Sequence, residues 1–263
     1  MKKYLIMFFV LVLTLLFSGV LKAFFSSHHN TIKIITWNID CLSGNFKERY
    51  ENITKIIHKE DPDIITLQES NAFFFKELKN NYNSYFKSDF CGALTTMSKY
   101  PIVQQNCYIG KTLQCRPVLI VDILINQSIV RIINVHLDSS SYYKRMRISQ
   151  MKYINTKIDS TNTIYLGDFN FSDELEATTI HRSLTDSWLM FAPNENGYTW
   201  DMDNNPMAKK NAFGNDTNSR LDRIYLSQAF QIKNMYLIGK EKIRDQMWPS
   251  DHYGVVIEVD LLN

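Results

Sequence analysis

From residue 32 onwards, the chain alternates between short apolar runs and stretches whose apolar residues recur every three or four positions. This alternation limits the fold more than any other feature. IKIITW, at residues 32–37, has the length and composition of a buried strand. Apolar residues at helical spacing from Phe46 to Ile57 predict an amphipathic helix over residues 46–58. Strands and helices that alternate in this way predict an α/β fold.

The other predicted elements follow the same two patterns. Two buried strands, 118–125 and 129–135, should form a hairpin around Asn126-Gln127, and apolar spacing from Ile148 to Ile158 predicts a second helix. The further predicted strands are 63–67, 163–167, 221–226, 232–238 and 255–259. Strands in the middle of the chain have near neighbours to pair with, whereas those towards the ends are separated by helices. We therefore expect two mixed sheets covered by helices, in one domain over residues 31–263.

The first thirty residues follow another pattern. Residues 4–21 carry no charge, and a helix of that length spans roughly the hydrocarbon thickness of a bilayer. The run exceeds the apolar region of about 7–15 residues in a cleaved signal peptide, which favours a single-pass membrane anchor. With Lys2 and Lys3 in the cytosol, the body would face away from it. Secretion after cleavage is the alternative, so residues 1–30 are assigned to an anchor or signal segment and a joint.

The charge of the body bears on its partners. The chain has a formal net charge of +2, and residues 1–30 hold three lysines and no acid, which leaves 2 − 3 = −1 for the body. A near-neutral body lacks the broad basic field of a protein that coats nucleic acid. Local capture of a phosphate through a metal ion is compatible with this charge.

The four cysteines, Cys41, Cys91, Cys107 and Cys115, have no CxxC spacing and no histidine beside them. This pattern argues against a zinc site. One or two disulfides would fit a domain outside the cytoplasm, although the spacing does not specify them.

Polar side chains collect at the ends of the predicted strands. Asn38 and Asp40 follow the first strand and Glu69 follows the second. The same placement holds for His136, Asp138, Asp168, Asn170, Asp222, Asp251 and His252. Strand ends are where α/β folds gather binding groups. Carboxylates, amides and imidazoles without cysteine are hard ligands that suit Mg²⁺, with Mn²⁺ as the other candidate. The pattern therefore predicts a metal-assisted phosphate site.

The order of these motifs resembles a known family. WN, QE, HLD, GDFN, RLDRI and SDHYG occur in sequence between residue 37 and residue 254. This is the signature of the endonuclease/exonuclease/phosphatase superfamily, which the chain resembles from residue 32 to its C-terminus. The resemblance implies a DNase-I-like, four-layered α/β sandwich and one catalytic domain.

Within that superfamily, the chain is most similar to the 5′-tyrosyl-DNA phosphodiesterase branch. TWNIDCLS at 36–43, YTWD at 198–201 and SRLDRIY at 219–225 carry the likeness. It implies Mg²⁺-dependent hydrolysis of a 5′-tyrosyl-DNA or 5′-tyrosyl-RNA phosphodiester that leaves a 5′-phosphate. The branch usually has arginines shortly after its HL-acid-S and GDxN motifs. Here Ser141 and Ser172, or their neighbours, stand there, which would weaken the grip on nucleic acid or shift the substrate.

The resemblance also implies roles around the metal and the attacking water. Glu69 would anchor the ion, with Asp40 and Asp251 as direct or water-mediated ligands. Asp168 would accept a proton from the water or align it. Asn38 and Asn170 would hold Asp168 and the phosphate in line.

A second set of implied roles concerns the phosphate and the rest of the substrate. His252 would donate hydrogen bonds to the phosphoryl oxygens, and Asp222 would set its tautomer and favour its charged form. His136 and Ser139 would contact the same phosphate. Trp200 and Tyr82 could stack on an unpaired terminal base. For Tyr82, packing in the core is an equally good interpretation.

Two alternatives remain open at this point. The first keeps the enzyme and changes its substrate, to a membrane-tethered or secreted endonuclease or exonuclease, or to a sphingomyelinase or phosphoinositide phosphatase. The second is a non-catalytic binding module, which predicts eroded motifs, and none of the motif residues is missing. No obligate protein partner is implied.

Overall fold

A computed structural model of the protein describes residues 31–109, 114, 116–158, 161–214 and 216–262. The described residues from Thr31 onwards form one compact unit. The predicted N-terminal hydrophobic helix at residues 4–21 lies outside the described residues and stays a prediction. Within the described ranges, no helix is both long enough and apolar enough to cross a bilayer.

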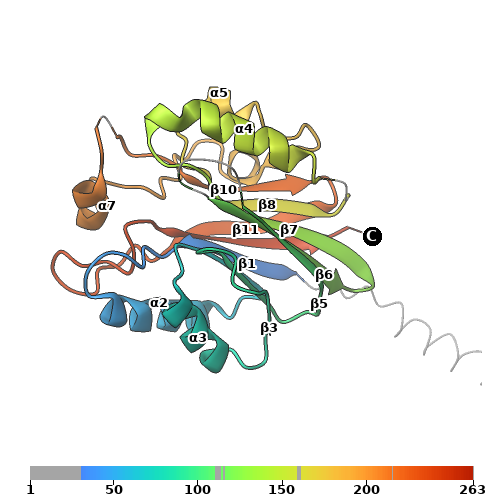
Figure 1. Ribbon diagram of the computed structural model, residues 1–263, viewed down its shortest axis with the longest axis horizontal. Coiled ribbons are helices and arrows are strands. Elements are labelled where there is room, and N and C mark those ends of the chain that lie inside the picture. The colour runs from blue at the N-terminus through green and yellow to red at the C-terminus, as the bar shows by residue number, and fades with distance from the viewer. Residues whose placement is uncertain (1–30, 110–113, 115, 159–160, 215, 263) are drawn as a thin grey trace, which may run out of the picture. The chain divides into compact units, whose positions relative to one another are not determined.

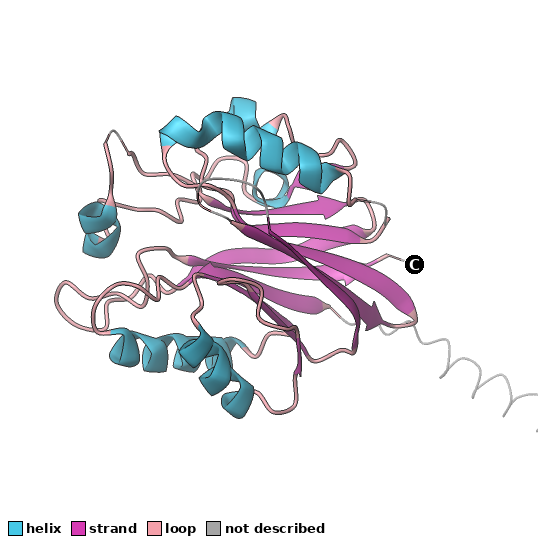
Figure 2. Ribbon diagram, viewed as in Figure 1, coloured by secondary structure: helices cyan, strands magenta, loops and turns pink. Residues whose placement is uncertain are grey.

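Two six-stranded sheets make up the centre of this unit (Figures 1 and 2). The first sheet has the order β11 (Phe230–Ile238), β12 (Gly254–Leu261), β1 (Ile32–Asn38), β2 (Ile64–Gln68), β4 (Thr95–Ser98) and β3 (Phe86–Lys87). The second has the order β5 (Ile102–Ile109), β6 (Pro117–Ile125), β7 (Ser128–His136), β8 (Thr163–Asp168), β10 (Asp222–Ser227) and β9 (Leu184–Asp186). Both sheets are mixed, because β1 and β2 are parallel in the first and β7 and β8 in the second.

Helices cover the outer faces of the sheets. Figure 1 shows α2 (Phe46–Glu60) and α3 (Ala72–Asn81) against the first sheet, and α4 (Lys144–Asn155) and α5 (Glu174–Ala177) against the second. The shorter elements are η1 (Ser141–Tyr143), α6 (Ser187–Phe191) and α7 (Pro206–Asn211). The prediction of two mixed sheets flanked by helices is confirmed. Each strand predicted by its range ends within two residues of its predicted bounds, whereas α3 was not predicted.

Alternation along the strands explains the layers. In β1, Ile32 and Ile34 pack between the two sheets, whereas Ile35 and Trp37 pack under α2 and α3. Successive side chains of a strand point to opposite faces, so a strand with apolar residues on both faces must be covered on both. A third apolar cluster, which includes Met151 of α4, lies on the outer face of the second sheet.

The predicted hairpin between β6 and β7 is present. Asn126 and Gln127 both have positive φ, at 48° and 67°, as a two-residue type I′ turn requires. Val118 therefore pairs with Val135, which returns the start of β6 to the end of β7. This register brings residue 116 to the strand end that carries His136.

Candidate active site

A cleft of about 810 Å³ opens at the ends of the central strands. Nine of the predicted site residues line it: Asp40, Glu69, His136, Ser139, Asp168, Asn170, Trp200, Asp251 and His252. Asn38 and Asp222 are buried and hydrogen-bond to members of that set. The structure therefore brings eleven of the twelve predicted residues together, and Tyr82 is the exception.

Strand pairing explains this convergence. The parallel pair of β1 and β2 sets Asn38 beside Gln68, so Glu69 follows at the same edge. The parallel pair of β7 and β8 sets His136 beside Asp168. Parallel neighbours end at the same edge of a sheet, so the polar residues that follow them meet there.

The backbone is unusual at three of these strand ends. Asp40, Glu69 and Asn170 have φ of 43°, 52° and 52°, in the left-handed region. Such conformations are uncommon for residues other than glycine, and they cluster at functional sites because the surrounding structure holds them. Residue 167 must be glycine for a steric reason, since a Cβ there would lie 2.1 Å from the carbonyl oxygen of Val135.

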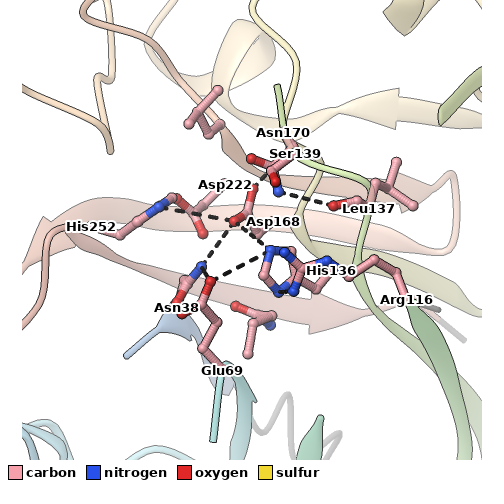
Figure 3. Close-up of polar contacts among 12 residues, drawn as sticks. Asn38, Glu69, Arg116, His136, Leu137, Ser139, Asp168, Asn170, Asp222 and His252 are labelled. Carbon is pink, nitrogen blue, oxygen red and sulfur yellow. Dashed lines mark hydrogen bonds and ion pairs between the residues drawn. The ribbon is translucent and has the colours of Figure 1, made fainter. Parts of the chain in front are cut away.

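Asp168 is at the centre of the polar contacts (Figure 3). Its Oδ2 accepts a hydrogen bond from Asn38 Nδ2 at 2.9 Å, and its Oδ1 accepts one from the backbone N–H of Asn170 at 2.9 Å. Burial, followed by the nearby charge of Asp222, raises the pKa of Asp168 to about 6, although His252 opposes this. Near neutral pH the group is mainly ionised and sufficiently basic to accept a proton.

His252 forms a buried ion pair with Asp222. The Nδ1 of His252 lies 2.7 Å from Asp222 Oδ2, and its Nε2 lies 3.9 Å from Asp168 Oδ2. Burial by itself would lower the pKa of His252. The charges of Asp222 and Asp168 outweigh that effect and raise the pKa well above its usual value. His252 is therefore a charged donor near neutral pH.

His136 has the opposite character. Its Nδ1 lies 3.0 Å from Arg116 Nη1, and a guanidinium can only donate, so Nδ1 accepts and Nε2 carries the proton. That Nε2 lies 3.4 Å from Asp168 Oδ2 and 3.7 Å from Glu69 Oε1. Burial and then the charge of Arg116 lower the pKa of His136 well below its usual value. His136 is a neutral donor whose Nε2 lies near two carboxylates.

Arg116 was not singled out from the sequence. It lies one residue before β6, and the predicted hairpin places that position opposite the residues that follow β7. Extending the hairpin register by two residues would have placed Arg116 at the site.

The oxygen ligands fit a divalent cation. Burial, followed by the charge of Asp251, raises the pKa of Glu69 to about 7 and that of Asp40 to about 6. Asp40 Oδ2 is buried and has no hydrogen-bond partner among the described residues. Buried carboxylates that repel one another are stabilised by a hard cation such as Mg²⁺.

Another group of possible metal ligands is defined by the distances between their ligand atoms. Among the described acids, histidines and cysteines, only Asp168, Asp222 and His252 each offer one ligand atom within 4.8 Å of the others. However, the pKa of His252 is raised despite burial, chiefly by the charge of Asp222, so both of its ring nitrogens carry protons near neutral pH and neither offers a lone pair to an ion. Glu69 as the anchor of the ion, with Asp40 and Asp251 as direct or water-mediated ligands, stays a prediction.

Trp200 and Ser139 both line the cleft. The ring of Trp200 is 4.9 Å from that of His252, edge to face, and its Nε1 is buried with no hydrogen-bond partner among the described residues. Ser139 lines the cleft, and its backbone N–H donates to Gln114 Oε1 at 2.9 Å. Both contacts with substrate remain predictions.

Tyr82 as a substrate-stacking residue is wrong. Its side chain is 4% exposed, belongs to the apolar cluster under α2 and α3, and stacks on His58 with the rings 4.6 Å apart. The alternative of core packing holds, because α3, which Tyr82 caps, lies on the outer face of the first sheet.

The structure also describes the disulfide state of three of the four cysteines. Cys91 and Cys107 form a disulfide with a Cα–Cα distance of 5.7 Å, and Cys41 is free. Cys115 lies outside the described residues.

Comparison with known proteins now bears on this site. A model described as "Endonuclease/Exonuclease/phosphatase family" matches residues 35–252. The chain belongs to this family. It is therefore a metal-dependent phosphodiester hydrolase.

Its curated relatives include tyrosyl-DNA phosphodiesterase 2 of Gallus gallus, 28% identical over 253 residues, which cover 89% of this chain and 68% of that protein. The Homo sapiens protein of the same name is 26% identical over 250 residues, covering 87% of this chain and 68% of that protein. Among solved structures, D. rerio TDP2 complexed with single-strand DNA product superposes with a TM-score of 0.78 at 24% identity. That match covers 88% of this chain and 99% of the other, and it establishes the fold.

Proposed function

We propose that this protein hydrolyses the phosphodiester that joins a 5′ end of DNA or RNA to a tyrosine, leaving a 5′-phosphate. The observation that carries the proposal is the arrangement of Asp168, Glu69 and His252 in one cleft. Asn38 donates hydrogen bonds to both Asp168 and Glu69, and Asp222 forms an ion pair with His252. The substrate class is supported by the relatives named tyrosyl-DNA phosphodiesterase 2.

Mg²⁺, or Mn²⁺ in its place, is the proposed cofactor. Glu69 would hold it, with Asp40 and Asp251 as direct or water-mediated ligands. When bound, the ion neutralises charge on a non-bridging phosphate oxygen and on the departing oxygen.

The proposed base is Asp168. Its hydrogen bonds from Asn38 and Asn170 fix both carboxylate oxygens, so the proton of an attacking water has one defined acceptor. A positioned base of this kind contributes about 10²–10⁴-fold to a rate.

The phosphate would be held by two different histidines. His252 presents a charged Nε2–H because Asp222 binds its other nitrogen, and negative charge builds on the phosphoryl oxygens during attack. His136 presents a neutral Nε2–H whose direction is set by Arg116. Tyrosine leaves as a phenolate with a pKa of about 10, so the reaction does not require a strong general acid.

A substrate panel tests the proposal. A 5′-tyrosyl oligonucleotide, plain duplex, abasic duplex and sphingomyelin are each incubated with the protein and Mg²⁺. We expect the tyrosyl oligonucleotide to be cleaved fastest, with a 5′-phosphate as product. Faster hydrolysis of plain duplex or of sphingomyelin would move the protein to one of the alternative substrates.

Two variants connect that activity to the site. Glu69→Gln and Asp168→Asn keep the side-chain shapes and should each reduce turnover by orders of magnitude while the far-ultraviolet circular dichroism stays that of the wild type. Undiminished hydrolysis by either variant would refute the assignment.

We further propose that residues 4–21 anchor the chain in a membrane by a single pass, with secretion after cleavage as the alternative. The support is the length of their uncharged run. Sequencing the N-terminus of the mature protein separates the two, because cleavage would remove everything up to about Ala23.

A further inference from the structure

A buried polar bridge joins the two sheets directly beneath the site. Gln68 of β2 donates from Nε2 to Asn134 Oδ1 of β7 at 2.8 Å, and also lies 3.1 Å from Thr36 Oγ1. Asn134 in turn donates to the carbonyl oxygens of Leu67 and Thr95, at 3.3 and 3.1 Å. Gln68, Asn134 and Thr36 are fully buried. We call the bond between Gln68 and Asn134, with its contact to Thr36, the cross-sheet bridge.

The cross-sheet bridge lies in the layer of side chains next to the site residues. In a strand, residues two positions apart lie on the same face of the sheet. The position of a residue that directly follows a strand is set by the last paired residue of that strand. The bridge residues each precede a site residue by one or two positions: Thr36 precedes Asn38, Gln68 precedes Glu69, and Asn134 precedes His136.

The site depends on contacts between the two sheets. Asn38 of the first sheet lies 2.9 Å from Asp168 of the second, and Glu69 of the first lies 3.7 Å from His136 of the second. Elsewhere between the sheets the side chains are mainly apolar. Apolar burial is non-directional and tolerates sliding, whereas a hydrogen bond requires a defined distance and angle.

Stability alone does not explain the bridge. Gln68 Oε1 is buried and has no hydrogen-bond partner among the described residues, so the pair carries the cost of an unsatisfied acceptor. Apolar side chains of similar shape would avoid the cost of that acceptor. The loss would be confined to the bonds that Asn134 donates to the carbonyl oxygens of Leu67 and Thr95 and that Gln68 donates to Thr36.

We infer that Gln68 and Asn134 are positioning residues, which set the offset of the two sheets and thereby hold Asn38 and Glu69 against Asp168 and His136. The inference rests on the proposed function for its catalytic consequence. Misplacement of reacting groups by about 1 Å can cost about 10²-fold in rate, so a small slide of one sheet is sufficient to matter.

The test is the full-length double variant Q68M/N134L, which replaces both side chains by apolar ones of similar shape and removes the bridge. Melting temperature, kcat and KM are measured on the tyrosyl oligonucleotide, and crystal structures measure the Asn38–Asp168 and Glu69–His136 distances. Thr66→Val is the matched control. It removes a buried bond of 3.0 Å, from Thr66 Oγ1 to the carbonyl oxygen of Ile35, between β1 and β2 of the same sheet.

We expect the double variant to have a melting temperature close to that of the control Thr66→Val. Its kcat should fall by about tenfold to 10²-fold with little change in KM, and its Asn38–Asp168 and Glu69–His136 distances should be longer than in the wild type. Wild-type kcat with unchanged distances would overturn the inference, and so would an equal loss of kcat in Thr66→Val. If wild type cleaves no tested ester, the proposed function fails, and the two crystallographic distances still decide the positioning role. If the double variant does not fold, Asn134→Ser, whose side chain is too short to reach Gln68, takes its place in each comparison.

Discussion

Replacing Asp222 with Asn isolates the electrostatic contribution of the His252–Asp222 pair. Asn has the shape of Asp and can still accept from His252 Nδ1, which lies 2.7 Å from Asp222 Oδ2, so the variant removes charge rather than geometry. Opposite unit charges about 4 Å apart attract by about 4 kcal/mol at an effective dielectric constant of about 20, the value that suits protein sites. That is about three powers of ten in the equilibrium between charged and neutral imidazole.

The expected result has two parts. Near neutral pH, kcat of Asp222→Asn should fall about 10²–10³-fold, the usual cost of losing one donor to a developing oxyanion. The ratio of variant to wild-type kcat should then rise as pH falls, because acid restores the charge on His252 that Asp222 no longer favours. The ratio does not cancel the titration of Asp168, because the charge of Asp222, after burial, also raises the pKa of that group. Removing this charge keeps Asp168 ionised to a lower pH, which raises the ratio in the same direction.

The assay is a pH–rate profile of both proteins on one substrate at saturating metal. Asp122→Asn is the control, since Asp122 is also a buried carboxylate in a pair, with Arg131 at 2.8 Å, but it lies on β6 away from the cleft. The control should lose stability and keep its kcat. A ratio for Asp222→Asn that stays constant across the pH range would refute the charge argument.

Two further predictions concern the same cleft. In metal-free protein, the free energy of unfolding should fall as pH rises between about 4 and 7. The reason is that the folded-state pKa values of Asp40, Glu69 and Asp168, at about 6, 7 and 6, are above their unfolded values of 3.8, 4.5 and 3.8, so the folded state binds more protons in that window. Melting curves recorded at several pH values with a chelator present measure this fall in stability, and adding Mg²⁺ should reverse it. A melting temperature that rises with pH in the metal-free protein would contradict the prediction. Trp200→Ala should raise KM for an oligonucleotide about tenfold through the loss of stacking, whereas Tyr82→Leu, which also removes an aromatic ring, should lower stability and leave KM unchanged. A raised KM in Tyr82→Leu would return that ring to the site.

Local patterns in the sequence were sufficient for eight of the twelve described strands and for most of the site, whereas β3, β4, β5 and β9 were not among the predicted ranges. Runs such as residues 129–135 are apolar on both faces, and a strand of that kind has no stable place except inside a covered sheet. Neighbouring parallel strands end at the same edge of a sheet. The polar residues at those ends, such as Asp168 and Glu69, could therefore be assigned to one edge of the fold from the sequence alone. The helix α3 was missed because three consecutive phenylalanines, with the lysines and asparagines of residues 72–81, obscure the helical spacing of its buried residues Phe74, Phe75 and Leu78.

Contacts between residues far apart in the sequence were decided only by the tertiary structure. Tyr82 and Trp200 are both aromatic residues in polar surroundings of the sequence, and only the fold places one in the core and the other in the cleft. The opposite protonation of His136 and His252 depends on Arg116 and Asp222, which lie 20 and 30 residues away along the chain. Alternation along a strand specifies which face a side chain occupies, because that is a property of the local backbone. The side chain that lies opposite it on another strand depends on how the strands pair and how the sheets pack. Those pairings determine the chemistry of this site.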